Sequence, residues 1–149
     1  MTTIGFSEDK PFSDRAIKFT AGITGLYFIF LKDVRISYPF ESSRLIYIGM
    51  SESRQNSIGK RLRSHLTGQS GNRAIKNYSS CHEVRFTHYP SKLLENIGTA
   101  NLSLIESIFL EEFMRAHGAF PICNNQSGVQ PTSAARYTKD LIVDWRYFS

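Results

Sequence analysis

The chain alternates between short apolar segments and polar stretches, and the apolar segments have the spacing of strands or of helices. From Gly25 the sequence GLYFIFLKD carries apolar or aromatic side chains at both even and odd positions, which is typical of a strand covered on both faces. After a loop with Pro39, RLIYIGMS has the β-branched and aromatic content of a second strand. We therefore expect these two strands to pair, with a long connection between them.

A short amphipathic helix is predicted after the second strand. Ser57 lies in the N-cap position, and Gly68 supplies a C-terminal stop. Between them apolar residues recur every four positions, at Ile58, Leu62 and Leu66. This spacing places the three side chains on one face of the helix.

The rest of the chain adds a third strand and a long helix. Residues 81–90, CHEVRFTHYP, alternate apolar and polar side chains, which predicts a strand with one exposed face. Residues 102–116 form the most strongly helical segment. We expect one domain, residues 1–149, in which segments 1–21 and 126–149 flank a core of residues 22–125. The order of elements predicts a small α/β fold.

The composition is that of an ordinary globular domain. Of 149 residues, 41% are hydrophobic and 21% are charged, which excludes a wholly disordered chain. Eighteen Lys and Arg against thirteen Asp and Glu leave a charge of +5, which mildly favours a polyanionic partner. Cys81 and Cys123 lie far apart, the N-terminus lacks an apolar leader, and the longest apolar run, residues 26–31, is too short to span a bilayer. We expect a cytoplasmic protein with no membrane partner.

Glu106 is the first candidate for a functional site. On a helical wheel of residues 102–116 it lies within the apolar stripe, whereas Glu111 points to the opposite side and Glu112 lies at the margin. The stripe is formed by Leu102, Ile105, Phe109, Phe113 and Ala116. A carboxylate turned towards a core is costly unless it is paired, protonated or bound to a metal. A metal ligand and a buried Glu–Arg pair are the two interpretations, and the residues alone favour the pair slightly.

The predicted helix after Ser57 carries a second set of candidates. Arg61 and His65 are four residues apart, so they lie one above the other and flank the apolar stripe. We expect both to face the sheet. Lys60 and Arg63 fall further round the helix, where they form either a solvated charged face or contacts to phosphates.

Tyr27 and Tyr47 lie on the two paired strands, each beside a glycine. A tyrosine in a strand is most often a core aromatic residue. Its hydroxyl, however, needs a partner when it is buried. The sharper hypothesis is that both hydroxyls point into one site.

Together these residues closely resemble the GIY-YIG nuclease domain, over residues 22–125. The order of the motifs carries the resemblance more than any single motif does. The matching positions are GLY at residues 25–27, YIG at residues 47–49, Arg61 with His65, Glu106, and Asn124 after PIC.

The resemblance implies a three-stranded antiparallel sheet flanked by helices and a site that cleaves DNA phosphodiester bonds. Glu106 would hold a single Mg²⁺ or Mn²⁺ ion, Arg61 would contact the phosphate and His65 would assist proton movement. Tyr27 would orient or deprotonate the attacking water with Tyr47 beside it, while Asn124 would support the site or simply be a loop residue. Which tyrosine acts on the water is left open.

The chain departs from the family pattern at three places. Leu26 replaces the central Ile of the first motif, and the connection between the two tyrosine motifs is longer than in the family's shortest forms. The interval between Glu106 and Asn124 is also longer than usual. Glu111, Glu112 or Asn125 are therefore alternatives for these two roles, although the helical wheel favours Glu106.

Three functions compete at this point. The first is a metal-dependent DNA endonuclease, for which RNA is the alternative substrate. The second is a nucleic-acid-binding module without turnover, and the third is an unrelated α/β interaction domain. For the nuclease, specificity would come from the flanking segments, from a homodimer or from a partner protein.

Overall fold

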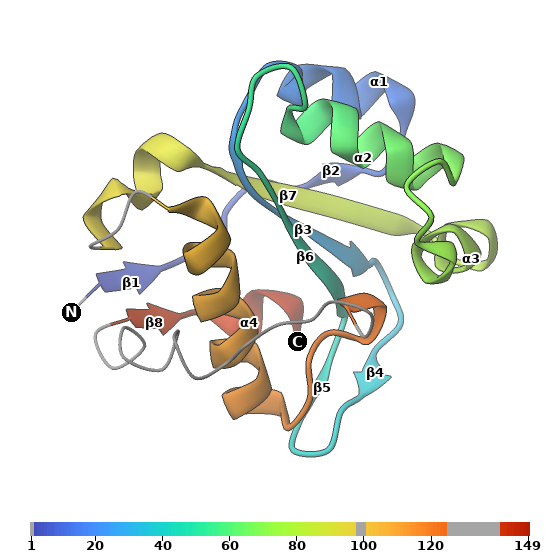
Figure 1. Ribbon diagram of the computed structural model, residues 1–149. Coiled ribbons are helices and arrows are strands. Elements are labelled where there is room, and N and C mark those ends of the chain that lie inside the picture. Colours follow the sequence, from blue (N-terminus) through green and yellow to red (C-terminus); the bar gives the residue numbers. More distant parts are fainter. Residues whose placement is uncertain (1, 98–100, 125–140) are drawn as a thin grey trace.

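The computed structural model describes residues 2–97, 101–124 and 141–149, arranged as helices on both sides of a central antiparallel sheet (Figure 1). Within these residues the sheet has four strands in the order β2-β7-β3-β6. Its strands are β2 (Lys10–Pro11), β3 (Gly25–Leu31), β6 (Leu45–Ser51) and β7 (Val84–Pro90). The remaining strands are β1 (Thr2–Ile4), β4 (Ile36–Ser37), β5 (Ser42–Ser43) and β8 (Leu141–Val143). The α-helices are α1 (Asp14–Ile17), α2 (Ile58–Thr67), α3 (Arg73–Cys81) and α4 (Leu102–His117). The 3₁₀ helices are η1 (Lys18–Thr20), η2 (Ser91–Ile97), η3 (Ile122–Asn124) and η5 (Trp145–Phe148).

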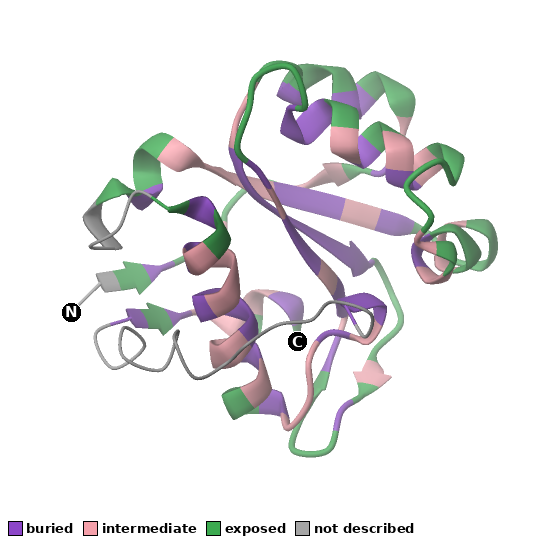
Figure 2. Cartoon of the chain, viewed as in Figure 1, coloured by how far each residue is buried: buried purple, intermediate pink, exposed green. Residues whose placement is uncertain are grey.

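Strand β3 is the centre of the fold, as its two-sided apolar pattern predicts. All seven of its residues are buried (Figure 2). Its odd-numbered side chains pack with α1, α2 and α3, whereas its even-numbered side chains pack with α4 and the C-terminal segment. The sheet therefore separates two hydrophobic cores.

The predicted pairing of the first two strands is confirmed. Strands β3 and β6 are antiparallel, with Tyr27 opposite Gly49 and Ile29 opposite Tyr47. The long connection between them contains the small β4–β5 hairpin. Because residues opposite each other in a ladder share a face, Tyr27 and Tyr47 lie on the same side of the sheet.

The expected three-stranded sheet is wrong by one strand. Lys10 and Pro11, expected to belong to a flanking segment, pair with Phe86 and Arg85 of β7 and add a fourth strand. Strand β7 therefore lies between two neighbours, and none of its seven residues is exposed, in contrast to the predicted open face. A two-residue strand that includes a proline has no alternation that a sequence pattern could reveal.

Helices α2 and α4 follow their predicted limits closely. Ser57 caps α2 by accepting a hydrogen bond from the Lys60 amide, and Gly68 ends the helix with a φ of 85°. Helix α4 runs one residue beyond the predicted end. At that end the helical wheel is wrong, since Ala116 is exposed and His117 is buried in its place.

The two ends of the described chain meet beside the α4 core. Strand β1 pairs in parallel with β8, and Phe148 of η5 is fully buried among the even-numbered side chains of β3. Residues 125–140, which include the alternative candidate Asn125, lie outside the described residues. Over the described residues, no helix has the length and apolarity needed to cross a membrane.

Candidate active site

Tyr27 lies at the centre of a hydrogen-bonded group that joins β3 to α2. Its hydroxyl is 3.0 Å from Nε2 of His65 and accepts a hydrogen bond of 3.4 Å from Nε of Arg61. Arg61 and His65 are one helical turn apart, so a single face of α2 delivers both groups to the same oxygen. The expectation that both side chains face the sheet is confirmed.

Gly49 makes room for the phenol of Tyr27. The two residues are opposite each other in the ladder, and a Cβ atom at Gly49 would lie 2.3 Å from Cζ of Tyr27. Any larger residue would displace the ring from its position against β6. This contact explains why the second tyrosine motif ends in a glycine.

Tyr47 lies next to this group but is only half-buried. Its ring centroid is 6.0 Å from that of Tyr27 and 5.0 Å from that of His65, with an edge-on arrangement to the imidazole. Burial raises the pKa of Tyr47, and the nearby Glu106 raises it further. Burial likewise raises the pKa of Tyr27 far above its usual value.

A cleft of about 320 Å³ opens beside Tyr47. Its polar walls come from α2, from the turn between α2 and α3, and from η3. The cleft is lined by Tyr47, Arg61, His65, Ser70, Gly71, Asn72, Cys123 and Asn124. Five of the six residues predicted for the site therefore meet at or directly behind this cleft.

Glu106 approaches the same group from α4. It is half-buried, and burial raises its pKa to about 7, although Arg61 lowers it and Glu52 raises it again. The carboxylate in turn raises the pKa values of Tyr27 and Tyr47, so it lies within electrostatic reach of both phenols. Arg61 lowers the pKa of this half-buried carboxylate, although no hydrogen bond or ion pair joins the two side chains in the described part of the structure.

His65 is uncharged at neutral pH in this environment. It is 4% exposed, and burial together with Arg61 lowers its pKa to about 4. Its second nitrogen, Nδ1, is 2.8 Å from the hydroxyl of Ser70 in the turn after α2. Ser70 was not among the predicted site residues, because a serine in a polar turn has no distinguishing pattern in the sequence.

The side chain of Asn124 is hydrogen-bonded to the backbone of β6. Its side-chain oxygen accepts a hydrogen bond from the Ile48 amide, and its side-chain nitrogen donates one to the Ile48 carbonyl, both at 2.9 Å. Since Ile48 lies between Tyr47 and Gly49, the amide holds the strand beside the site. Asn124 therefore joins η3 to β6 next to Tyr47, and its support of a catalytic site stays a prediction.

Asn72 performs a related task in the turn between α2 and α3. Its side chain caps α3 by accepting from the Ile75 amide at 3.2 Å, and it donates to the Cys123 carbonyl at 3.0 Å. The turn is thereby tied to η3 across the cleft. Sequence reasoning missed Asn72, although its position just before a helix is typical of an N-cap.

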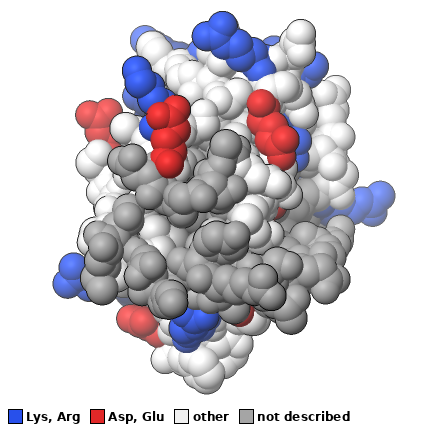
Figure 3. All heavy atoms as spheres, turned by 60° about the vertical axis from the view of Figure 1, so that its left-hand side comes forward, with Lys and Arg blue, Asp and Glu red and all other residues white. Residues whose placement is uncertain are grey.

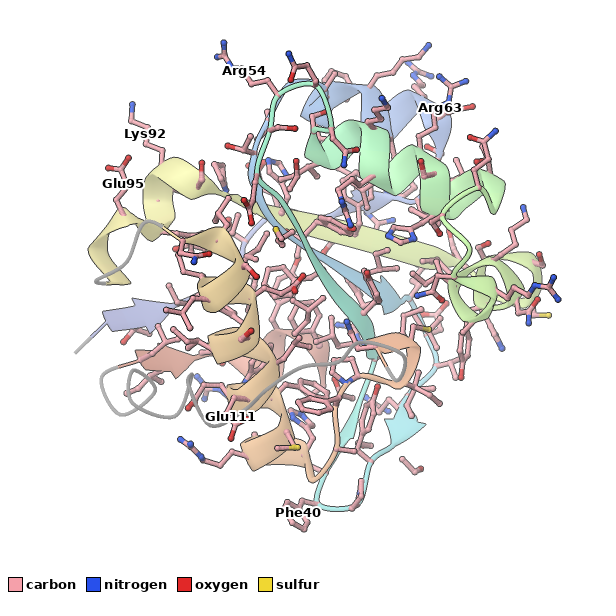
Figure 4. All side chains as sticks on the ribbon, in the orientation of Figure 1. Phe40, Arg54, Arg63, Lys92, Glu95 and Glu111 are labelled. Atoms are coloured by element: carbon pink, nitrogen blue, oxygen red, sulfur yellow. The ribbon has the colours of Figure 1, made fainter. Side chains whose placement is uncertain are left out.

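The other predicted cations lie on the outside of α2. Lys60 is exposed, and Arg63 forms an exposed ion pair of 3.6 Å with Asp14 of α1. Figure 4 shows Arg63 pointing outward at the end of the molecule formed by α1 and α2. Arg63 therefore lies on the side of α2 that faces α1, whereas Arg61 faces the cleft.

Glu111 and Glu112 occupy the later part of α4. Glu112 pairs with Arg115 at 2.8 Å, and Glu111 is half-buried on the same helix (Figure 4). The pKa of Glu112 is raised by burial and by Glu111 and lowered by Arg115. The charges that act on Glu112 thus belong to α4, whereas those that act on Glu106 are Arg61 of α2 and Glu52, which follows β6.

No family model matches the chain, and no curated protein and no solved structure shows a significant match to it.

Proposed function

We propose that the protein is a divalent-metal-dependent endonuclease that hydrolyses DNA phosphodiester bonds with a site of the GIY-YIG type. The observation that carries the proposal is that side chains of two helices, α2 and α4, act on the phenols of Tyr27 and Tyr47. Arg61 and His65 from α2 reach the Tyr27 hydroxyl, and a half-buried carboxylate from α4 acts on the same phenols. Phosphodiester hydrolysis needs such a set, because it requires an activated water and relief of charge on the phosphoryl oxygens.

The donor atoms at this site suit a hard cation. Glu106 offers carboxylate oxygens and the tyrosines offer phenol oxygens, which are the donors that Mg²⁺ and Mn²⁺ prefer. Among the described residues no three His, Cys, Asp or Glu side chains lie together as a metal-binding group. Mg²⁺ is commonly held by one or two carboxylates together with substrate phosphates and water, so Glu106 alone suffices as the protein ligand. When bound, the cation would supply charge to the phosphate oxygens.

Arg61 is arranged to hold the scissile phosphate. Its Nε atom donates a hydrogen bond to the Tyr27 hydroxyl, and its two terminal nitrogens make no hydrogen bond to any described residue. A guanidinium keeps its charge at all relevant pH values and binds phosphate oxygens with two parallel donors. Arg61 therefore orients the phosphate and holds the Tyr27 oxygen with a single side chain.

The test is cleavage of supercoiled plasmid DNA with Mg²⁺ or Mn²⁺, with and without chelator. The wild-type protein should nick or linearise the plasmid only with metal. Glu106→Gln and Arg61→Ala should each abolish this cleavage, because the first removes the metal ligand and the second removes the phosphate contact. The assignment of Glu106 as the metal ligand fails if Glu106→Gln cleaves as well as wild type, and the proposed function fails if the wild-type protein does not cleave DNA with metal.

Two matched variants control for the alternative carboxylates. Glu111→Gln and Glu112→Gln remove the other α4 carboxylates and should retain cleavage. Thermal unfolding should show that the Glu106→Gln variant is at least as stable as wild type at pH 8, since it removes a charge whose burial is unfavourable. Loss of cleavage in Glu111→Gln with retention in Glu106→Gln would transfer the ligand role to Glu111.

A nucleic-acid-binding module without turnover is the second candidate, and the distribution of charge favours it independently of any catalysis. Between Glu52 and Glu83 the chain has no acidic residue and six basic ones, at Arg54, Lys60, Arg61, Arg63, Arg73 and Lys76. We call these six side chains the α2–α3 basic surface. Binding to DNA without metal-dependent cleavage would favour this second function.

A further inference from the structure

We infer that the exposed ring of Phe19 and the cations around it form a second nucleic-acid contact, at which an unpaired base stacks on the ring. The contact consists of Lys10, Arg15, Lys18 and Phe19, and we call these four side chains the Phe19 patch. The inference rests on the proposed function and adds to it a class of substrate, DNA that carries a single-stranded segment.

The side chain of Phe19 is exposed although the backbone that carries it is held in place. Phe19 is 71% exposed, whereas the nearby Ile17 and Thr20 are 3% and 0% exposed. The Thr20 hydroxyl donates to the Ile17 carbonyl at 2.7 Å across the residues between them. A ring on such a fixed turn loses little conformational freedom when a ligand binds, so Phe19 is suited to serve as a stacking platform.

The turn that carries Phe19 is packed against the first turn of α2. A Cβ atom at Gly59 would lie 2.9 Å from the backbone nitrogen of Ala21, so the two backbones are in direct contact. Lys60 and Arg61 follow Gly59 in the helix. The Phe19 patch and the α2–α3 basic surface are therefore held by the same helix.

The cations of the Phe19 patch are suited to contact phosphates. Nζ of Lys10 lies 5.2 Å from the centroid of the aromatic ring, and Arg15 and Lys18 are exposed on the helical segment that carries the ring. Asp14, the acidic residue of that segment, is paired with Arg63 of α2 at 3.6 Å. In the described part of the chain none of the three cations of the patch forms an ion pair.

These surroundings favour a single-stranded nucleic acid as the ligand. One exposed apolar side chain is common on protein surfaces, so the neighbours of Phe19 decide its interpretation. An aromatic ring among cations is the arrangement by which proteins bind single strands, because a base stacks on the ring while the cations contact the backbone. In a duplex each base is covered by its neighbours, so only an unpaired base can use the ring. We therefore expect the Phe19 patch to bind single-stranded DNA in preference to a blunt duplex.

Fluorescence anisotropy in chelator, with labelled oligo(dT) and a labelled blunt duplex, tests the contact. Phe19→Ala should weaken the binding of oligo(dT) by about tenfold, the effect of losing one stacked base, and should change duplex binding much less. Phe40→Ala is the matched control. Phe40 is also exposed, at 74%, but it lies at the opposite end of the molecule from Arg63 (Figure 4). This control should bind both ligands as wild type does.

Two further variants separate stacking from simple apolar contact. Phe19→Trp keeps a stacking ring, so it should bind oligo(dT) at least as tightly as wild type, and the emission of the introduced indole should be quenched on binding. Wild type, whose one tryptophan is Trp145, gives the background signal. Phe19→Leu keeps apolar surface without an aromatic ring and should bind as weakly as Phe19→Ala. Thermal unfolding verifies that each variant is folded.

Equal affinities of wild type and Phe19→Ala for oligo(dT), or full binding by Phe19→Leu, would overturn the inference. A wild-type protein that binds vesicles containing phosphatidylserine but not oligo(dT) would overturn it as well, because the patch would then contact a membrane surface. Metal-dependent plasmid cleavage tests the proposed function separately. Cleavage together with unchanged oligo(dT) binding in Phe19→Ala removes the inference alone, whereas binding that depends on Phe19 without any cleavage removes the nuclease alone.

Discussion

At the scale of single residues, the site depends on polar groups that are buried but satisfied. His65 is 4% exposed, yet both of its nitrogens have a hydroxyl partner, at Tyr27 and at Ser70. Such a histidine is stable only in its neutral form, because the charged form would lose the hydration that burial removes. Its protonation therefore opposes folding.

This burial predicts a loss of stability in acid. The pKa of His65 is about 4 in the folded protein and near 6.5 when the chain is unfolded. Because the folded pKa is the lower one, the unfolded chain binds the proton first as the pH falls. The contribution of neutral His65 is complete above about pH 6.5 and is lost between pH 6.5 and 4, with a magnitude of about 3 kcal/mol.

Urea unfolding of wild type and of His65→Gln across this range measures the effect. The variant cannot titrate at this position, so its free energy of unfolding should fall less steeply between pH 6.5 and 4. His88 and His117, whose pKa values are also lowered by burial, titrate in both proteins and cancel in the comparison. His82→Gln, at an exposed position, should retain the wild-type slope, and an equal slope in His65→Gln would contradict the prediction.

At the scale of elements, the second tyrosine motif lies on an edge strand that needs support. Within residues 2–97, 101–124 and 141–149, strand β6 pairs with β3 on one side only. The Asn124 side chain accepts a hydrogen bond from the Ile48 amide and donates one to the Ile48 carbonyl. A neighbouring strand would form the same two kinds of hydrogen bond. Asn124 of η3 therefore provides strand-like hydrogen bonds to one residue of β6. These bonds fix the strand that carries Tyr47 and Gly49.

Removal of this amide should destabilise the fold and loosen the site. Asn124→Ala loses two buried hydrogen bonds and leaves the Ile48 amide unsatisfied, so we expect a loss of about 2–3 kcal/mol in the free energy of unfolding. Urea denaturation measures this loss. Asn77→Ala, which changes an exposed asparagine on α3, is the matched control and should leave stability nearly unchanged. Similar midpoints for both variants would show that the amide contributes little.

At the scale of the whole molecule, the positive charge is concentrated on one part of the chain. The α2–α3 basic surface accounts for six of the eighteen basic residues, and the remainder of the chain has twelve basic and thirteen acidic residues. Several Lys and Arg side chains are also visible along the upper end of the face in Figure 3. The net charge of +5 thus comes from the segment between Glu52 and Glu83, which includes α2 and α3, rather than from the molecule as a whole.

Binding to DNA should therefore depend on salt through this surface. In chelator, the logarithm of the binding constant should fall linearly with the logarithm of the salt concentration, and Lys60→Gln should reduce the slope by about 1 for each lost phosphate contact. Fluorescence anisotropy with a labelled duplex gives both slopes. Lys92→Gln removes an exposed charge from η2, outside the surface, and should keep the wild-type slope. An equal reduction of the slope in both variants would mean that DNA binding depends on the total charge of the protein and not on the α2–α3 basic surface.

The elements that carry the site were predictable because their signals are local. The two-sided apolar pattern of β3, the caps of α2 at Ser57 and Gly68, and the i to i+4 spacing of Arg61 and His65 each lie within one turn or one strand. Periodicity alone is enough to place such side chains on the correct face. The helical wheel placed Glu106 towards the core and Glu111 on the opposite side, but the structure leaves both half-buried, with one oxygen of Glu111 fully buried.

The contacts that complete the site join segments far apart in the chain, so no local pattern encodes them. The pairing of Lys10 and Pro11 with β7 joins segments more than seventy residues apart, and the amide of Asn124 reaches a strand 76 residues earlier. The enclosure of Tyr27 by Gly49 and His65, with Tyr47 left at the cleft, is settled by the register of β6 and by the packing of α2 on the sheet. The sequence by itself determined which groups face the sheet, and the tertiary structure decided which of them are buried and which can meet a ligand.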